Sequence, residues 1–494
     1  IRDGWLAQTV LFSSETSIHP TAKQVRRPAR SSYAPSAPGR FAMPGHARRD
    51  IVRPGQIAVY HTWSRCVQRA FLCGEDPVTG NNFDHRRLWI KTLLEYQASV
   101  FAVEVGNYTI LANHQHAILR TRPDVAATWP DEQVAWRWKL AWPRWEDGQW
   151  VCHPSDQEIE ELLNHPERIP QLRENLSSLS WFMARWKEPI ARLANAESQT
   201  KGHFYEQRFG SRELVDEGAV LCCSVYVDVN QIKAGMADSL EGSRYAAIHD
   251  RLQAWRRREA EESVRKFGAG QAEGYALDIS QVEELLADCF LAPIGDQGPL
   301  LLLDSADAAR LPAASLIVQD AESAPPQAES ANNQAEPVEK EKEGPQDNSS
   351  RVEGAPGEPS HQGATCTPGT SAVGRRKSRR SPQRTTKIHE RLQLQRRRRA
   401  SDHVFLAMAP EQYLQVVQWT ASQVVSGATH PPPGELEAVL RRWSVKSSSW
   451  PAVVEHFASW FHHAVGRVEN LTRRMALSGR RWIQGIRHCR DVFT

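Results

Sequence analysis

The chain has 494 residues, a formal net charge of +3 and eight cysteines. The length predicts two or three domains, and the absence of a long apolar run argues against a membrane-spanning helix. The first residues lack the basic region and apolar core of a secretory signal. Because no two cysteines form a CxxC pair, neither a zinc ribbon nor a disulfide framework is indicated, and reduced thiols in a cytosolic protein are expected.

The first half of the chain predicts an α+β domain. Residues 1–50 are rich in Pro, Ser, Arg and Ala without a period, and are expected to form a disordered basic arm. Over residues 51–250 the chain reads strand, helix, strand and strand, in the segments QIAVYHTWSRC, DHRRLWIKTLLEYQAS, VFAVEVGNYTILAN and HAILRT. This order favours a mainly antiparallel sheet flanked by helices.

Beyond residue 123 the composition of the chain changes several times. A tryptophan-rich insertion at 124–166 is followed by a long helix over RENLSSLSWFMARWKEPIARLANAE, expected to bend near Pro189, and residues 251–303 continue as a helical extension. Residues 304–402 are expected to form a disordered linker, ending in a basic run at 375–399. Helical periodicity returns at 403–494 and predicts a small helical domain.

Two histidines stand in the stretch TILANHQHAILRT. On a strand, residues i and i+2 point to the same face, so His114 and His116 would lie side by side with Gln115 on the other face. Two neutral imidazoles can supply two nitrogen ligands to a divalent metal. The alternative is a chance pair of histidines, each hydrogen-bonded in or near the core.

Five ordered blocks around this pair carry a family resemblance: VYHTWSRCVQRAFLCGED, LANHQHAIL, LSSLSWFMARWKEPIARLAN, GHFYEQRF and YVDVNQIKAGM. Together they resemble the HUH single-tyrosine transposases, in particular the REP-associated tyrosine transposases. The resemblance covers about residues 50–250. Gln115, Gln231 and Lys233 depart from the family pattern, which has an apolar residue, Pro and Arg at these positions.

The resemblance implies a ferredoxin-like or RRM-like HUH fold and a DNA transposition chemistry. A Mg or Mn ion held by His114 and His116 would polarise a phosphate of single-stranded or hairpin DNA. A tyrosine hydroxyl would attack that phosphate, forming a phosphotyrosyl bond and releasing a 3′-hydroxyl. The resemblance also implies a cytoplasmic, nucleoid-associated protein, with a homodimer as one possibility.

The nucleophile and the third ligand do not match the pattern in an obvious way. The resemblance implies a tyrosine on the long helix, about five residues before an asparagine that corresponds to Asn195, which gives Ile190 or Pro189. Tyr205 is the alternative nucleophile, although an aromatic packing role suits it as well. Glu188, on the same helix, is the candidate third ligand. Tyr226 lies in an apolar helix and reads as a core tyrosine.

Basic and aromatic residues predict a DNA-binding surface. Arg65, Arg69 and Arg208 lie in the family-like blocks and are candidates for phosphate contacts, as is Lys233. Trp138, in the stretch WRWKLAWPRW, is a candidate for base stacking. The basic run at 375–399 would add affinity for polyanions without sequence preference.

Three functions therefore compete. The first is a transposase-like enzyme that cleaves and rejoins DNA strands. The second is a catalytically degenerate, transposase-derived DNA-binding protein, because residues 189 and 190 cannot supply a hydroxyl. The third is a metal-dependent hydrolase that uses the histidines without a tyrosine, a weaker candidate because no carboxylate cluster accompanies them.

Limited proteolysis tests the predicted linker. The Ala, Ser, Pro, Glu and Gln composition of residues 305–386 cannot bury enough apolar area to offset a backbone ordering cost of about 1 to 2 kcal/mol per residue. We expect a nonspecific protease to cut there first, as mapped by mass spectrometry of the fragments. Protection of these residues in the free protein would contradict the prediction.

Overall fold

The computed structural model describes residues 51–76, 79–142, 144–146, 149–151, 154–268, 286–296, 399–427, 430–479 and 483–494. The expectations for the basic arm at 1–50, and for the linker and basic run between residues 304 and 398, fall outside these residues.

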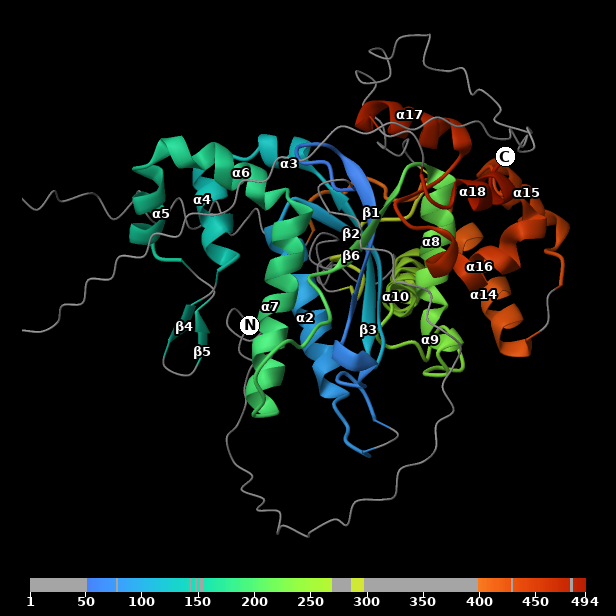
Figure 1. Ribbon diagram of the computed structural model, residues 1–494, viewed down its shortest axis with the longest axis horizontal. Coiled ribbons are helices and arrows are strands. Elements are labelled where there is room, and N and C mark those ends of the chain that lie inside the picture. Colours follow the sequence, from blue (N-terminus) through green and yellow to red (C-terminus); the bar gives the residue numbers. More distant parts are fainter. Residues whose placement is uncertain are drawn as a thin grey trace, which may run out of the picture. The chain divides into compact units, whose positions relative to one another are not determined.

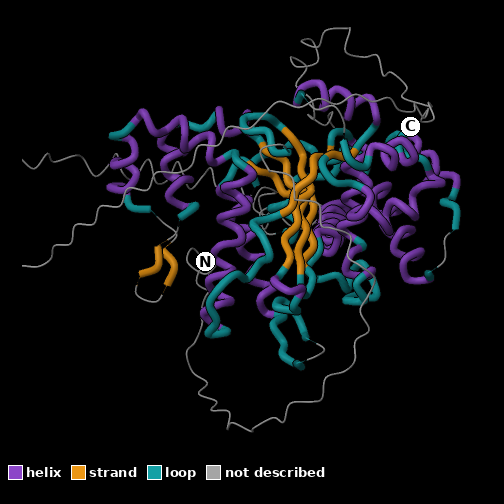
Figure 2. Tube along the Cα trace, viewed as in Figure 1, coloured by secondary structure: helices purple, strands orange, loops and turns teal. Residues whose placement is uncertain are grey.

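A five-stranded sheet forms the centre of the fold, in the order β2-β3-β1-β6-β7 (Figures 1 and 2). Its strands are β1 (Ala58–Arg65), β2 (Val103–Ile110), β3 (His114–Thr121), β6 (Gly210–Leu214) and β7 (Ala464–Val465). The first four strands pair antiparallel, whereas β7 pairs parallel with β6. The α+β class is confirmed, and the sheet is mixed because the C-terminal part of the chain contributes its edge strand.

Helices cover both faces of the sheet (Figure 1). One face carries α2 (His85–Val100) and α7 (Leu179–Glu197), with α3 (Pro123–Ala127), α4 (Asp131–Leu140), α5 (Asp156–Leu163) and α6 (Ile169–Leu176) packed beyond them. The insertion also contains the hairpin of β4 (Arg144–Glu146) and β5 (Gln149–Val151). The other face carries α8 (Glu217–Asp228), α9 (Asn230–Lys233), α10 (Ala247–Gly268), α14 (Pro410–Ser426), α15 (Gly434–Arg442), α16 (Trp450–Trp460), α17 (Val468–Ser478) and α18 (Ile486–Val492).

Strand alternation divides the core into two clusters. Tyr60 and Leu119 point into the cluster that contains α7, while Val59 and Ile118 point into the cluster that contains α8 and α16. Successive side chains of a strand face opposite sides of the sheet, so one strand supplies both clusters. Within one strand, odd-numbered residues therefore face one cluster and even-numbered residues face the other.

The predicted long helix is two helices in the structure. The chain breaks at Ser177 and Ser178, between α6 and α7, and α7 then continues through Pro189. Proline removes the hydrogen bond to the carbonyl four residues earlier, which is that of Arg185. The side-chain amide of Gln97 donates to this carbonyl at 3.5 Å, which gives it a partner from outside the helix.

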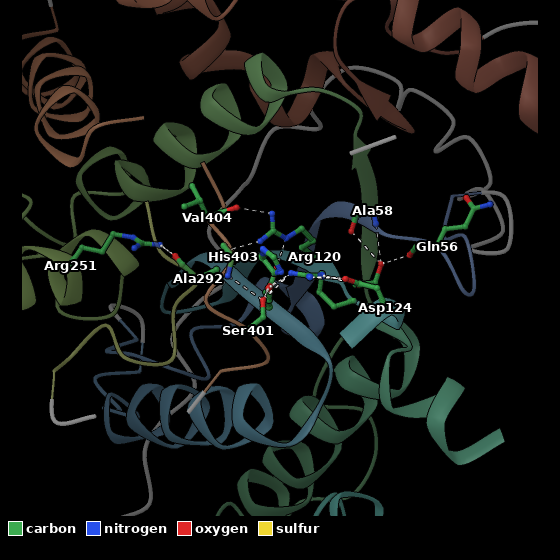
Figure 3. Close-up of polar contacts among 12 residues, drawn as sticks. Gln56, Ala58, Arg120, Asp124, Arg251, Ala292, Ser401, His403 and Val404 are labelled. Carbon is green, nitrogen blue, oxygen red and sulfur yellow. Dashed lines mark hydrogen bonds and ion pairs between the residues drawn. The ribbon is translucent and has the colours of Figure 1, made fainter. Parts of the chain in front are cut away.

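The C-terminal residues share the core of the α+β domain instead of forming a separate helical domain. The described residues from 399 to 494 belong to the same compact unit as the sheet. Figure 3 shows one tie between them: the Arg120 guanidinium, buried on β3, donates to the carbonyls of His403 at 3.1 Å and Val404 at 3.0 Å. Gly106 makes room for Phe405, since a Cβ there would lie 2.2 Å from the Phe405 ring.

Asp228 makes a second tie, deep in the core. Its carboxylate accepts hydrogen bonds from the Tyr413 hydroxyl, the Asn107 amide and the Ile248 backbone N–H. Burial is the main cause that raises the pKa of Asp228 to about 7, although these donors act against it.

Among the helices of the described residues, none has both the length and the apolar character needed to cross a bilayer.

The raised pKa of Asp228 predicts a pH-dependent stability. Between pH 4 and 7 the folded state binds the Asp228 proton more tightly than the unfolded state, so stability falls as pH rises through this window. The effect approaches about 4 kcal/mol above pH 7. We expect Asp228→Asn to remove most of this slope in urea unfolding at pH 5 and 7.5. The exposed Asp238→Asn should retain it, and an unchanged slope in Asp228→Asn would contradict the prediction.

Candidate functional site

The histidine pair lies at the N-terminal end of β3, an interior strand next to the central strand β1. His114 is opposite Arg65 and His116 is opposite Trp63 on the antiparallel strand β1. The two imidazole rings lie on the same face of the sheet, with their centroids 5.0 Å apart and their planes at 84°. The expected placement of the pair is therefore found.

Asn113 orients the first of these rings. Its side-chain oxygen lies 2.6 Å from Nδ1 of His114, and its amide nitrogen donates to the Arg69 carbonyl at 3.2 Å. Because an amide oxygen only accepts, Nδ1 of His114 carries the proton and Nε2 carries a lone pair. Burial, assisted by the nearby Arg65 charge, lowers the pKa of His114 to about 4, so the ring is neutral at physiological pH.

A third histidine, which the sequence analysis did not single out, completes the cluster. Nε2 of His61 on β1 lies 2.9 Å from Nδ1 of His116, and the two rings stack with centroids 5.0 Å apart. Burial is the largest cause that lowers the pKa of both rings well below 6.5. The cluster thus presents neutral imidazoles, the form that binds metals and accepts protons.

Tyr226 is the tyrosine that faces these histidines. It lies on α8, and its ring meets His116 edge-on at 5.7 Å and His61 at 6.0 Å. Burial raises its pKa, whereas the Arg212 charge and a hydrogen bond to Asn230 act in the opposite direction. A neutral hydroxyl beside neutral imidazoles is the ground state of a tyrosine nucleophile that must lose its proton during attack.

Helix α16 covers this site. Phe457 stacks on Tyr226 with ring centroids 5.1 Å apart, and it meets His61 at 5.9 Å. Two cations hold the end of the helix: Arg212 donates to the Phe457 carbonyl at 2.8 Å, and Lys233 donates to the Val454 carbonyl at 2.8 Å. Tyr226 is consequently only 7% exposed.

The position that the resemblance implies for a tyrosine on the long helix lies on the other side of the sheet from the histidines. Ile190 is buried in the core cluster of α7, together with Tyr60 and Leu119. His116 lies on the opposite face, where it contacts Tyr226. No side chain at position 189 or 190 of α7 reaches the histidines, because the sheet lies between them.

Tyr205 and Glu188 also lie away from the histidine face. The Tyr205 hydroxyl donates to the side chain of Gln115 at 3.3 Å, and alternation turns Gln115 away from His114 and His116. Glu188 lies on α7 and pairs with Arg185 and Arg192 on the same helix. The structure does not bring either residue to the predicted site.

The predicted DNA-binding residues are spread over several surfaces. Arg65 is half-buried beside the histidines, whereas Arg69 and Arg208 are exposed. Lys233 lies 5.4 Å above the Tyr226 ring and is bonded to α16 carbonyls. Trp138 packs against Trp142 and Trp181 on the α4 side of the molecule.

The fit of a divalent cation can be tested on the donor atoms. Within the described residues, no group of three or more His, Cys, Asp or Glu side chains could hold a metal ion. His116 Nε2, however, is buried and has no hydrogen-bond partner within this part of the chain. Together with the lone pair on Nε2 of His114, this unpartnered nitrogen is chemically suited to a divalent cation, and the Mg or Mn ion stays a prediction.

The sequence analysis interpreted Tyr226 as a core tyrosine, and its burial on α8 agrees with that interpretation. Its position against His61 and His116 was not predicted, because α8 is buried on all sides, from Gly218 to Asp228. An apolar helix of this kind gives no periodicity from which to read the face that meets the sheet.

Comparison with known proteins adds little. No family model and no curated protein matches this sequence. One solved structure, a REP-associated tyrosine transposase bound to a REP hairpin, aligns over 42% of this chain and 83% of its own at 11% identity, with a TM-score of 0.24. This is a weak resemblance.

The α16 cover predicts a large effect of Phe457 on stability. Phe457→Ala removes a fully buried ring that packs on Tyr226 and His61, and should lower the free energy of unfolding by about 3 to 5 kcal/mol. Urea unfolding of the whole chain measures this. Ser459→Ala, on the exposed side of the same helix, should change it by less than about 0.5 kcal/mol. Equal effects of the two variants would contradict the packing described.

Proposed function

We propose that the protein is a transposase-like enzyme that cleaves and rejoins single-stranded or hairpin DNA, with Tyr226 as its nucleophile. The observation that supports this most directly is the placement of Tyr226 against His116 and His61, on the same sheet face as His114. A tyrosine, neutral imidazoles and adjacent cations are the groups that a phosphoryl transfer to a hydroxyl requires.

The reaction follows from these groups. The Tyr226 oxygen attacks the phosphorus of a phosphodiester, the tyrosyl O–P bond forms, and the bond from phosphorus to the 3′ oxygen breaks. The tyrosyl proton passes to a neutral base, and the leaving 3′ oxygen takes up a proton. The intermediate retains the energy of the phosphodiester, so the reverse attack by a 3′-hydroxyl joins strands without ATP.

Several residues around Tyr226 would have a task in this reaction. His114 and His116 would hold Mg or Mn, and the cation when bound would polarise the phosphate oxygens. Arg212 and Lys233 lie beside Tyr226 with their donors directed at carbonyl oxygens, the kind of acceptor that a phosphate also offers. Arg65, near His114, and the exposed Arg69 would contact the strand backbone. A cytoplasmic, nucleoid-associated location belongs to this proposal.

A second function is favoured by one observation. Tyr226 is 7% exposed beneath Phe457 of α16, so a phosphate reaches its hydroxyl only after α16 moves. If α16 stays in place, the chain is a DNA-binding protein that does not cleave. The same experiment separates the two functions.

A covalent-adduct assay tests the nucleophile. The full chain is incubated with a labelled single-stranded DNA hairpin and Mn, and the DNA-linked protein is resolved on a denaturing gel. We expect an adduct with the wild type and at least about a 1,000-fold loss in Tyr226→Phe. Tyr205→Phe is the matched control and should retain the adduct, because its hydroxyl faces Gln115 on the other side of the sheet.

Two results would overturn parts of this assignment. An adduct that persists in Tyr226→Phe but is lost in Tyr205→Phe would move the nucleophile. The absence of any adduct with every protein, with hairpin binding intact in a mobility-shift assay, would leave the DNA-binding function.

A further inference from the structure

His61 has no task in the chemistry described above, yet it is one of the most enclosed polar side chains at the site. It is 0% exposed, and its ring lies among Trp63 at 5.5 Å, Phe457 at 5.9 Å and Tyr226 at 6.0 Å. Burying a polar ring in such aromatic surroundings destabilises the folded state unless its nitrogens form hydrogen bonds. One nitrogen does so, since Nε2 of His61 lies 2.9 Å from Nδ1 of His116.

The contact between two neutral imidazoles allows two proton arrangements. In the first, Nδ1 of His116 donates to Nε2 of His61, and Nε2 of His116 carries a lone pair. In the second, Nε2 of His61 donates, and Nε2 of His116 carries the proton instead. Each neutral imidazole has one donor and one acceptor nitrogen, so only the first arrangement offers His116 as a ligand.

The remaining atoms of the pair show what decides between the arrangements. Nδ1 of His61 and Nε2 of His116 both lack a hydrogen-bond partner in the described part of the chain. A cation at Nε2 of His116 would satisfy one of these two atoms and select the first arrangement. His114 needs no such selection, because Asn113 already fixes its proton on Nδ1.

We propose that His61 is a positioning residue that accepts a hydrogen bond from Nδ1 of His116 and thereby presents Nε2 of His116 as a metal ligand. The inference rests on the proposed function, since it concerns the cation held by His114 and His116. Groups that hydrogen-bond the second nitrogen of a ligating histidine orient the ring and raise its basicity, and their loss weakens metal affinity by about 10- to 100-fold.

The test compares a substitution of His61 that removes the hydrogen-bond acceptor with one that keeps it. His61→Phe keeps a ring among the aromatic neighbours but removes the acceptor. His61→Gln places an amide oxygen near the position of Nε2, so the acceptor is kept. Mn²⁺ affinity of the full chain, measured by electron paramagnetic resonance of the free ion, should fall about 10- to 100-fold in His61→Phe. It should stay within about 3-fold of the wild type in His61→Gln.

Controls separate positioning from folding. His430→Leu, at an exposed histidine on a different segment, should leave Mn²⁺ affinity unchanged. Thermal unfolding is recorded for each variant, and His61→Leu replaces His61→Phe if the larger ring prevents folding. Hairpin binding without metal should be the same in the folded variants, which a general loss of structure would not allow.

The outcomes distinguish this inference from the function on which it rests. Weak Mn²⁺ binding in the Phe variant with recovery in the Gln variant supports the positioning role. Wild-type Mn²⁺ affinity in His61→Phe, or no recovery in a folded His61→Gln, overturns it while the proposed function stands. A wild type that binds no Mn²⁺ and forms no adduct overturns the proposed function and this inference together.

Discussion

The antiparallel register between β1 and β3 is the constraint on which the site depends. It sets Trp63 opposite His116 and Arg65 opposite His114, and it brings His61 within 2.9 Å of His116. A shift of β3 by one residue would turn His114 and His116 toward α7, away from His61, and would bring Gln115 to the α8 face. The register is fixed by the two core clusters, because the same shift would also exchange Ile118 with Leu119 on the two sides of the sheet.

The second face of the sheet is built from two parts of the chain that lie far apart in sequence. Helix α8 follows β6 directly, but the cluster in which it lies is completed by residues 405–493. Buried polar contacts make this union specific, since Arg120 would lose two carbonyl acceptors without residues 403–404, and Asp228 would lose one of its donors without the hydroxyl of Tyr413. The C-terminal helices are therefore part of the domain that holds the histidines.

The features that were predictable from sequence are local ones. Strand alternation alone places His114 and His116 on one face, and the spacing of apolar residues marks α2 and the α7 region. Which helix covers which face is a nonlocal property, and Ile190, a position implied by the resemblance, lies on the other face of the sheet from His116. The two-residue strand β7 could not be predicted, because its pairing with β6 depends on contacts made some 250 residues apart. The contact of Tyr226 with His61 and His116 could not be predicted for the same reason, because it joins α8 to two strands that lie far from it in the sequence.

Burial has opposite consequences for the two kinds of group at this site. It lowers the pKa of the histidines and so keeps them available as ligands or bases, while it raises the pKa of Tyr226 and so withholds the phenolate. The counterbalance is positive charge, since Arg212 lowers the pKa of Tyr226. Arg212 and Lys233 are at present bonded to carbonyls of α16, whose end carries partial negative charge. Under the proposed function, a DNA phosphate would require the same donors as the end of α16, so cleavage by Tyr226 would depend on the packing of the helix above it.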